Sequence, residues 1–141
     1  MKKHRKICWL LLGLIIIISC TKKPFDHRNK FIGNWKFKVE RTEFNTDSIG
    51  YYYHDSLTFI GQIKYGSSDN DLVIEYSSDN SIILKIDNEN ILYDFPTHYC
   101  SGEFDENDKL HLYLRWGGLG GGVTHIVDGE KNNDLLTINS Q

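Results

Sequence analysis

The sequence predicts an all-β domain built as an antiparallel meander, and three observations lead to this prediction. Apolar and polar residues alternate along most of the chain after residue 30, as they do from Trp35 to Val39. Clusters of Asn, Asp, Ser and Gly separate these alternating stretches at intervals typical of hairpins. No segment after residue 20 shows the apolar spacing of an amphipathic helix.

The strands follow one another in short steps along the chain. The first strand is centred on residues 35–39, and further strands are predicted over residues 51–59, 72–76, 82–86, 91–95, 110–116, 123–128 and 135–138. In the second strand we expect Tyr51 and Tyr53 to face the core, with Asp55 interrupting the apolar pattern and Tyr52 pointing outward beside His54. About eight short strands should close into a barrel, because closure removes exposed strand edges.

The last clear hairpin joins residues 110–116 to residues 123–128. If Trp116 pairs with Val123, then His111 lies opposite Asp128 as a cross-strand pair. The connection is rich in glycine and reads Gly117, Gly118, Leu119, Gly120, Gly121 and Gly122. A phosphate-binding loop would need a following helix and a Lys-Ser/Thr pair, and neither is present. We therefore predict a hairpin loop that serves as a ligand or contact loop at the barrel mouth.

The first twenty residues have the pattern of a secretory signal. Four of the first six residues carry a positive charge, and residues 7–18 are apolar. This stretch is shorter than the roughly 20 apolar residues that a membrane-spanning helix needs. The small Ser19 and then Cys20 follow, and the chain is polar beyond them. We therefore expect cleavage near this point rather than a retained span, although an ordinary secreted protein with an incidental Cys20 is an alternative.

Ile17, Ile18, Ser19 and Cys20 together resemble the lipobox of bacterial lipoproteins. The resemblance implies that the Cys20 sulfur receives a diacylglyceryl group and that Cys20 becomes the acylated N-terminus, with palmitate as a typical acyl chain. It predicts residues 1–19 as the signal peptide, 20–30 as the lipidated Cys and tether, and 31–141 as the barrel domain. The expected location is the bacterial cell envelope, on the outer membrane or the periplasmic face, with the membrane contacted through the lipid.

Gly33 and Trp35, at the start of the first strand, resemble the Gly-x-Trp opening of lipocalin-like (calycin) barrels. The resemblance implies an approximately eight-stranded barrel in which the Trp closes one end. It also implies an Arg from a late strand lying over that Trp, and Arg115 is the candidate by position. Strict alternation, however, places Arg115 on the face opposite Trp116.

Charge and length restrict the function further. Removing residues 1–19 leaves 122 residues, with 12 of the 16 basic residues set against all 19 acids, a formal charge of −7. A chain of this length forms one domain with a real core. The acid excess argues against nucleic acid as a partner, since that partner needs a clustered basic face.

The sequence offers no convincing catalytic or metal site. Cys100 is predicted to be a small buried residue, because no cysteine remains to pair with it once Cys8 is removed and Cys20 is acylated. His98 and Cys100 could supply two metal ligands, with His111, His125 or Asp94 as completions, but a structural zinc site needs four. We expect no cofactor and no metal, and non-enzymatic function is favoured over catalysis.

Two functional hypotheses remain open at this stage. In the first, the barrel encloses a small apolar ligand at the envelope. In the second, the barrel is a structural or inhibitor-like module whose loops contact another envelope protein. The many aromatic residues on the predicted inner face favour a filled barrel and so weigh against the first hypothesis.

Overall fold

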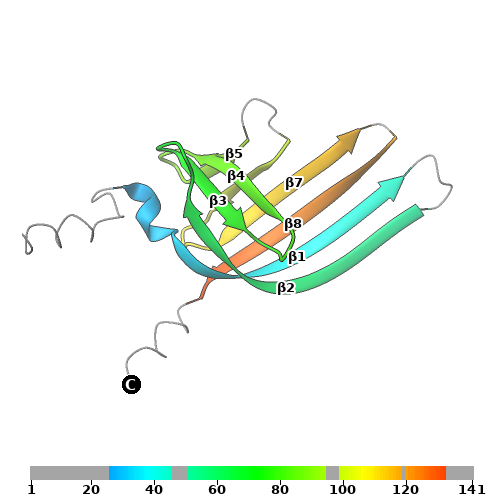
Figure 1. Cartoon of the computed structure of the whole chain (residues 1–141), viewed down its shortest axis with the longest axis horizontal. Helices are drawn as coiled ribbons and strands as arrows, with labels where there is room; N and C mark the ends of the chain where they lie inside the picture. Colours follow the sequence, from blue (N-terminus) through cyan, green and yellow to red (C-terminus); the bar gives the residue numbers. More distant parts are fainter. Residues whose placement is uncertain (1–25, 46–50, 95–98, 119, 133–141) are drawn as a thin grey trace, which may run out of the picture.

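The computed structural model is a closed barrel of eight antiparallel strands in simple meander order, which confirms the predicted fold class (Figure 1). It describes residues 26–45, 51–94, 99–118 and 120–132; the predicted signal peptide, Cys20, Phe95, His98, Leu119 and the strand predicted at 135–138 lie outside these ranges. A short 3-10 helix, η1 (His27–Lys30), precedes the strands. The strands are β1 (Gly33–Asn45), β2 (Tyr51–Tyr65), β3 (Asp71–Glu75), β4 (Ser81–Ile86), β5 (Ile91–Tyr93), β6 (Ser101–Phe104), β7 (Leu110–Gly118) and β8 (Gly121–Lys131).

Strand lengths divide the barrel into two parts. Strands β1, β2, β7 and β8 have 9 to 15 residues, whereas β3, β4, β5 and β6 have only 3 to 6. The four long strands therefore run on past the short ones, as Figure 1 shows on its right-hand side. We call this projecting part the open half and define it as residues 41–45, 51–57, 115–118 and 121–125. The remainder, where all eight strands form the wall, is the closed half.

The closed half is filled with apolar side chains. Its buried residues are Phe31, Trp35, Phe37, Val39, Ile63, Leu72, Ile74, Tyr76, Leu84, Ile86, Leu92, Cys100, Phe104, Leu110, Leu112, Leu114 and Val127. All eight strands contribute inward-facing residues to this set, as strand alternation requires. The burial of Cys100, which is 3 % exposed, confirms the expectation for that residue.

The predicted Gly-x-Trp opening lies at the end of the closed half where the chain enters. Gly33 has φ +134°, a conformation that other residues rarely adopt, so the glycine is required by the backbone. Trp35 is fully buried, and its indole Nε1–H donates to the Phe31 carbonyl at 2.7 Å. The Phe31 ring stacks on Phe104 with centroids 3.7 Å apart. Aromatic rings from the entry segment, β1 and β6 therefore close this end.

Arg28 fastens η1 to the β2–β3 turn. Its side chain is 3 % exposed and donates to the carbonyls of Ser68 at 2.9 Å and Asp71 at 2.8 Å. It also pairs with the Asp26 carboxylate at 2.6 Å and lies 5.0 Å from the centroid of the Tyr65 ring. Residues 26–30, predicted as part of the tether, thus pack against the barrel.

Two of the predicted turns have the same internal design. Asp87 accepts main-chain hydrogen bonds from residues 89 and 91 through its Oδ1, and Asp105 does the same with residues 107 and 109. Each turn contains a non-glycine residue with positive φ, Asn90 in one and Asp108 in the other. Asn and Asp tolerate this conformation better than other side chains, which is why these sequences form tight connections.

Two details of the predicted inner face are wrong. Tyr51, Tyr53 and Trp116 were expected in the core, but they are 48 %, 42 % and 41 % exposed. They lie on the inward side of long strands at a level where the short strands no longer form the opposite wall. The sequence pattern grouped Ile91, Tyr93 and Phe95 on one apolar face, but in β5 the inward residue is Leu92 and Ile91 is partly exposed, so the predicted alternation was out of phase by one residue.

Candidate functional site

The candidate site is the inner face of the open half, which begins where the apolar filling ends. Val39, Val127 and Leu112 are neighbours in one apolar row of the sheet. The next inward residues on β1, β2 and β8 are Arg41, Asp55 and His125. These three are direct neighbours across the sheet: Arg41 pairs with Asp55 on one side and with His125 on the other. Asp55, which interrupted the predicted apolar pattern of its strand, is thus part of a polar row.

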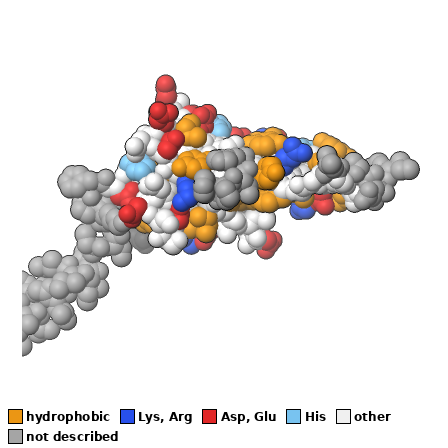
Figure 2. All heavy atoms as spheres, turned by 90° about the horizontal axis from the view of Figure 1, so that it is seen from above, with side chains coloured by type: hydrophobic (Ala, Val, Ile, Leu, Met, Phe, Trp, Pro, Cys, Tyr) orange, Lys and Arg blue, Asp and Glu red, His pale blue; other side chains and the backbone are white. Residues whose placement is uncertain are grey.

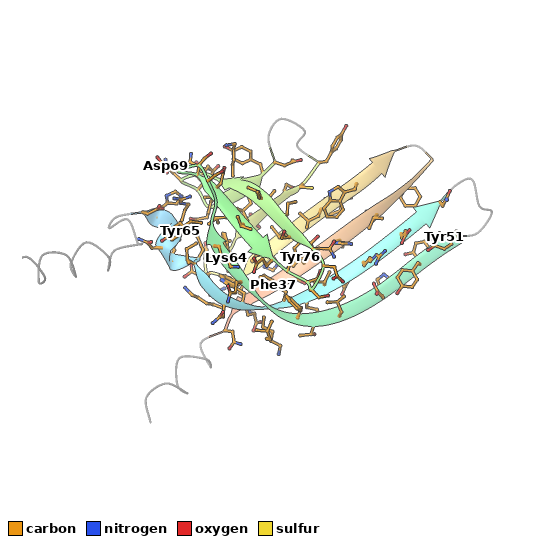
Figure 3. The ribbon with its side chains drawn as sticks, in the orientation of Figure 1. Phe37, Tyr51, Lys64, Tyr65, Asp69 and Tyr76 are labelled. Carbon is orange, nitrogen blue, oxygen red and sulfur yellow. The ribbon has the colours of Figure 1, made fainter. Side chains whose placement is uncertain are left out.

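A buried hydrogen bond separates the polar row from the core. The Tyr76 hydroxyl, from the chain just after β3, lies 3.0 Å from Nδ1 of His125. Both residues are almost fully buried, and the Trp116 ring meets the imidazole edge-on with centroids 5.1 Å apart. Figure 3 shows Tyr76 in the body of the barrel and Tyr51 at the far tip of β2. The imidazole is therefore fixed in place at the base of the open half.

The charged groups of the row are only partly satisfied by one another. Arg41 donates to Glu43 Oε2 at 2.9 Å, and the Tyr53 hydroxyl donates to Asp55 Oδ2 at 2.9 Å. The Arg41 Nε and the Asp55 Oδ1 are buried atoms without a hydrogen-bond partner among the described residues. The row thus contains one buried donor and one buried acceptor that the described residues leave unsatisfied.

The electrostatics of the row disfavour an anionic ligand. Arg41 faces two carboxylates, Glu43 and Asp55, so the cluster carries a net charge of about −1 with a neutral imidazole. Burial lowers the pKa of His125, and the nearby positive charge of Arg41 lowers it further, against a smaller opposing effect of Asp55. The imidazole is therefore neutral at pH 7. Burial also raises the pKa of the Tyr76 hydroxyl to about 12, which keeps it protonated.

Exposed aromatic rings and a surface hollow surround the row. Toward the strand tips, a hollow of about 460 Å³ is lined by Glu43, Phe44, Asn45, Tyr51, Gly120, Gly121, Gly122 and Val123. Tyr53 and Trp116 lie between this hollow and the polar row, in the next level of the sheet. Figure 2 shows that the molecule narrows toward this end and carries hydrophobic side chains on its surface there.

The glycine-rich segment forms the hairpin that the sequence predicted. Gly117 pairs with Gly122 and Gly118 with Gly121, so the connection between β7 and β8 is two residues long. Gly117 has φ +118°, and a Cβ there would lie 2.3 Å from the Gly121 carbonyl oxygen. The glycines thus permit a very close approach of the two strands, and three of them line the hollow at the tips. Whether this hairpin contacts a ligand or partner stays a prediction.

The same hairpin confirms the predicted register. Trp116 pairs with Val123 and His111 with Asp128, and Nδ1 of His111 lies 2.8 Å from the Asp128 carboxylate. Arg115 lies on the outer, exposed face of β7, whereas Trp35 is fully buried, so the structure does not bring the Arg115 guanidinium over Trp35. Arg115 instead lines a hollow of about 640 Å³ together with Phe44, Tyr99, Trp116, Gly117 and Gly118.

The open half also has two strand edges. β2 pairs with β3 only over Gln62–Tyr65, and β7 pairs with β6 only over Leu110–Tyr113. Within the described ranges, residues 51–60 of β2 therefore pair with β1 alone, and residues 114–118 of β7 pair with β8 alone. Unpaired backbone donors and acceptors at such edges are sites where another strand can add.

Metal and nucleophile chemistry find little support in the part of the chain that the structure describes. No group of three or more His, Cys, Asp or Glu side chains there is arranged to hold a metal ion. Burial raises the pKa of the Cys100 thiol, which keeps it in the unreactive protonated form. His98, the other predicted weak metal candidate, lies outside the described residues. Within the described ranges no helix is long and apolar enough to cross a membrane.

Sequence reasoning missed the polar row as a site, although a signal for it was present. In β1 the apolar inward positions end at Val39 and charged ones follow at Arg41 and Glu43. In β2 the exception at Asp55 occupies the same level, and in β8 His125 does. Such a simultaneous change from apolar to polar in three strands marks the end of a core, but it becomes visible only once the register is known. Comparisons with models of protein families, with curated proteins and with solved structures found no match to this chain.

Proposed function

We propose that this chain is a lipid-anchored, non-catalytic interaction module of the bacterial envelope, and that its open half binds another envelope protein. The observation that carries the proposal is the contrast between the two halves. The closed half is filled by buried side chains, whereas the open half presents exposed aromatic residues beside an incompletely satisfied polar row. Exposed Tyr and Trp side chains next to an Arg are typical of protein interfaces.

The geometry supports this proposal better than an enclosed apolar ligand. Ligand pockets are concave and mostly apolar, and they bury most of the ligand surface. Here the apolar side chains of the closed half pack against one another, with Phe37 bounded by the close approach of Gly61 and Gly129. The two hollows at the tips are open to the surface and contain Glu43, Asn45 and Arg115.

The anchor is proposed from the lipobox-like residues 17–20 and fits the way the chain enters the barrel. Five residues separate Cys20 from Asp26, so the lipid and the domain can be at most about 20 Å apart along the chain. Asp26 and η1 belong to the closed half, at the end opposite the strand tips (Figure 1). The open half would then point away from the membrane. Mass spectrometry of the mature protein tests the anchor: an N-terminus other than an acylated Cys20 contradicts it.

Site-specific photo-cross-linking in intact cells tests the interaction. A photoreactive residue at Trp116 or Tyr53 should yield a discrete cross-linked species with a second protein, because both side chains lie exposed on the inner face. The same residue at Lys64, which is exposed on the outside of the closed half, is the control and should yield none. Equal cross-linking at all three positions, or an adduct of small-molecule mass at Trp116, would overturn the proposal.

A further inference from the structure

The free edge of β2 is long, and its only Asp, Glu, Lys or Arg residue is the inward-pointing Asp55. Residues 51–60 pair only with β1 among the described residues, and eight of the ten are exposed. The stretch reads Tyr-Tyr-Tyr-His-Asp-Ser-Leu-Thr-Phe-Ile and contains no Lys, Arg, Pro or Gly. Natural proteins usually protect such edges with lysine, proline or a bulge. The free edge of β7, in contrast, carries Arg115, Gly117 and Gly118.

We propose that the free edge of β2, residues 51–60, pairs antiparallel with the same edge of a second copy of this chain, forming a two-fold symmetric dimer. This inference does not depend on the proposed function, because it uses the edge of the sheet rather than its inner face. Antiparallel pairing of two identical edges is self-complementary about a two-fold axis. It would join the two open halves into one continuous sheet of eight long strands.

A register centred on Ser56 fits the sequence of this edge. Opposite residues in an antiparallel pair point to the same face, so the axis must pass through a residue. An axis through Asp55 would place two carboxylates directly opposite each other, which is destabilising. An axis through Ser56 instead places Tyr53 opposite Phe59 of the second copy and Tyr52 opposite Ile60. These are aromatic–aromatic and aromatic–aliphatic pairs, which are the favourable kind.

A groove at the end of the edge lies where this register needs space. A groove of about 480 Å³ is lined by Phe59, Ile60, Gly61, Gln62, Glu75, Ser77, Ser78, Asp79, Asn80 and Ser81. It lies between the end of the free edge and the β3–β4 turn. In the Ser56 register, residue 60 of one copy faces Tyr52 of the other, so the Tyr51–Tyr52 end of the second copy arrives at this groove. The β3–β4 turn therefore leaves room for the added strand.

Disulfide trapping of the full chain in bacterial membranes tests the dimer. In the Ser56 register the two Ser56 Cα atoms are about 4.5–5.5 Å apart, within the range that a disulfide bridges. Ser56→Cys should therefore give a disulfide-linked dimer under mild oxidation. Thr58→Cys is the matched control, because it lies on the same exposed face but its symmetry mate is about four residues away along the strand, too far to bridge. The double variant His54→Cys/Thr58→Cys should restore the cross-link.

The outcomes are separable from those of the proposed function. A dimer with Ser56→Cys that is several times stronger than with Thr58→Cys supports the pairing. Equal dimer at Ser56, Thr58 and the surface position Ser78→Cys indicates random collision and overturns it. Linkage of Ser56→Cys to a different protein overturns the second copy as the occupant. Absence of dimer in a chain that remains protease-resistant overturns the pairing, while cross-linking at Trp116 still decides the proposed function by itself.

Discussion

Replacing Arg28 with methionine should destabilise the protein by about 3–4 kcal/mol at pH 7. Methionine keeps much of the side-chain volume but removes the charge and all five donors. Without the guanidinium, the Asp26 carboxylate, whose side chain is 8 % exposed, loses its main charge partner. The carbonyls of Ser68 and Asp71 each lose one hydrogen bond and keep one from a backbone N–H. Because η1 closes the entry end of the barrel, the loss falls on the closed half as a whole.

The magnitude follows from the pKa of Asp26 and from the two carbonyls. The hydrogen bonds and charge of Arg28 lower that pKa from 3.8 to about 2, against a smaller opposing effect of burial. At 1.36 kcal/mol per pKa unit this difference corresponds to about 2 kcal/mol. Each of the two hydrogen bonds lost from these carbonyls adds about 1 kcal/mol. The sum agrees with the roughly 3–5 kcal/mol observed when one member of a buried ion pair is removed.

The pH dependence gives the prediction a second, independent readout. The folded state holds Asp26 at a lower pKa than the unfolded chain does, so the unfolded chain binds the proton first as pH falls. The contribution of the pair is therefore complete above about pH 4 and is lost between about pH 4 and pH 2. The difference between wild type and Arg28→Met should shrink accordingly at pH 2.

Urea unfolding of the full chain in detergent micelles, followed by tryptophan fluorescence at pH 7 and pH 2, measures both effects. Lys64→Met is the matched control, because Lys64 also forms an ion pair, with Glu75 at 2.6 Å, but both side chains are exposed. Its cost should stay within about 1 kcal/mol. If Arg28→Met costs no more than Lys64→Met, or if its cost is the same at both pH values, the reasoning is refuted.

Three further predictions concern packing and electrostatics. Gly61→Ala should destabilise the protein by more than about 2 kcal/mol in the same assay, because a Cβ there would lie 1.9 Å from a backbone carbonyl oxygen of β3. Gly118→Ala is the control: its Cβ would meet nothing within 4 Å, so stability should change by less than about 0.5 kcal/mol. A double-mutant cycle on His111 and Asp128 should give a coupling energy of a few tenths to about 1 kcal/mol, and a value of zero would remove this pair from the account. The free energy of unfolding should fall as pH decreases below about 6.5, because the unfolded chain protonates His125 before the folded state does. His125→Gln should therefore reduce the pH dependence of stability between pH 7.5 and 5.5. An unchanged pH dependence would show that His125 is not its source.

Local patterns were sufficient to predict the fold class. The alternation in residues 35–39 and 110–116 predicts half-buried strands, and the Asp- and Asn-rich turns between them require short connections. The pairing of Trp116 with Val123 entered the sequence analysis as a condition, and the structure shows this pairing with a two-residue connection. These features depend on neighbours in the sequence, so the sequence alone carries them.

The division into two halves could not be predicted, because it depends on the relative lengths of strands that are distant in sequence. Tyr53 and Trp116 have the alternation of core residues, and they do point inward. Their exposure results from β4, β5 and β6 ending early, which leaves no wall opposite them. The polar row was hidden for the same reason: Arg41, Asp55 and His125 meet only through strand pairing.

Two arginines lie elsewhere than the sequence analysis expected. Arg28 lies in a polar segment that reads as a tether, and its burial arises from carbonyls some 40 residues later in the chain. The resemblance to lipocalin-like barrels suggested Arg115 as the arginine over Trp35, yet alternation along β7 places it outside. The conflict was visible in the sequence, and here alternation was the better guide.

The division of the barrel into a closed and an open half is tested most directly by hydrogen exchange. Exchange is measured residue by residue on the dilute full chain in detergent micelles. We predict slow exchange for the amides of Gln62, Ile63 and Leu110–Leu112, which have strands on both sides. Along residues 51–60, amides that point toward β1 should be protected and the alternate ones should exchange fast. Uniform protection along the whole of β2 in a sample too dilute to dimerise would show that another part of the chain covers this edge, and the open half would not exist.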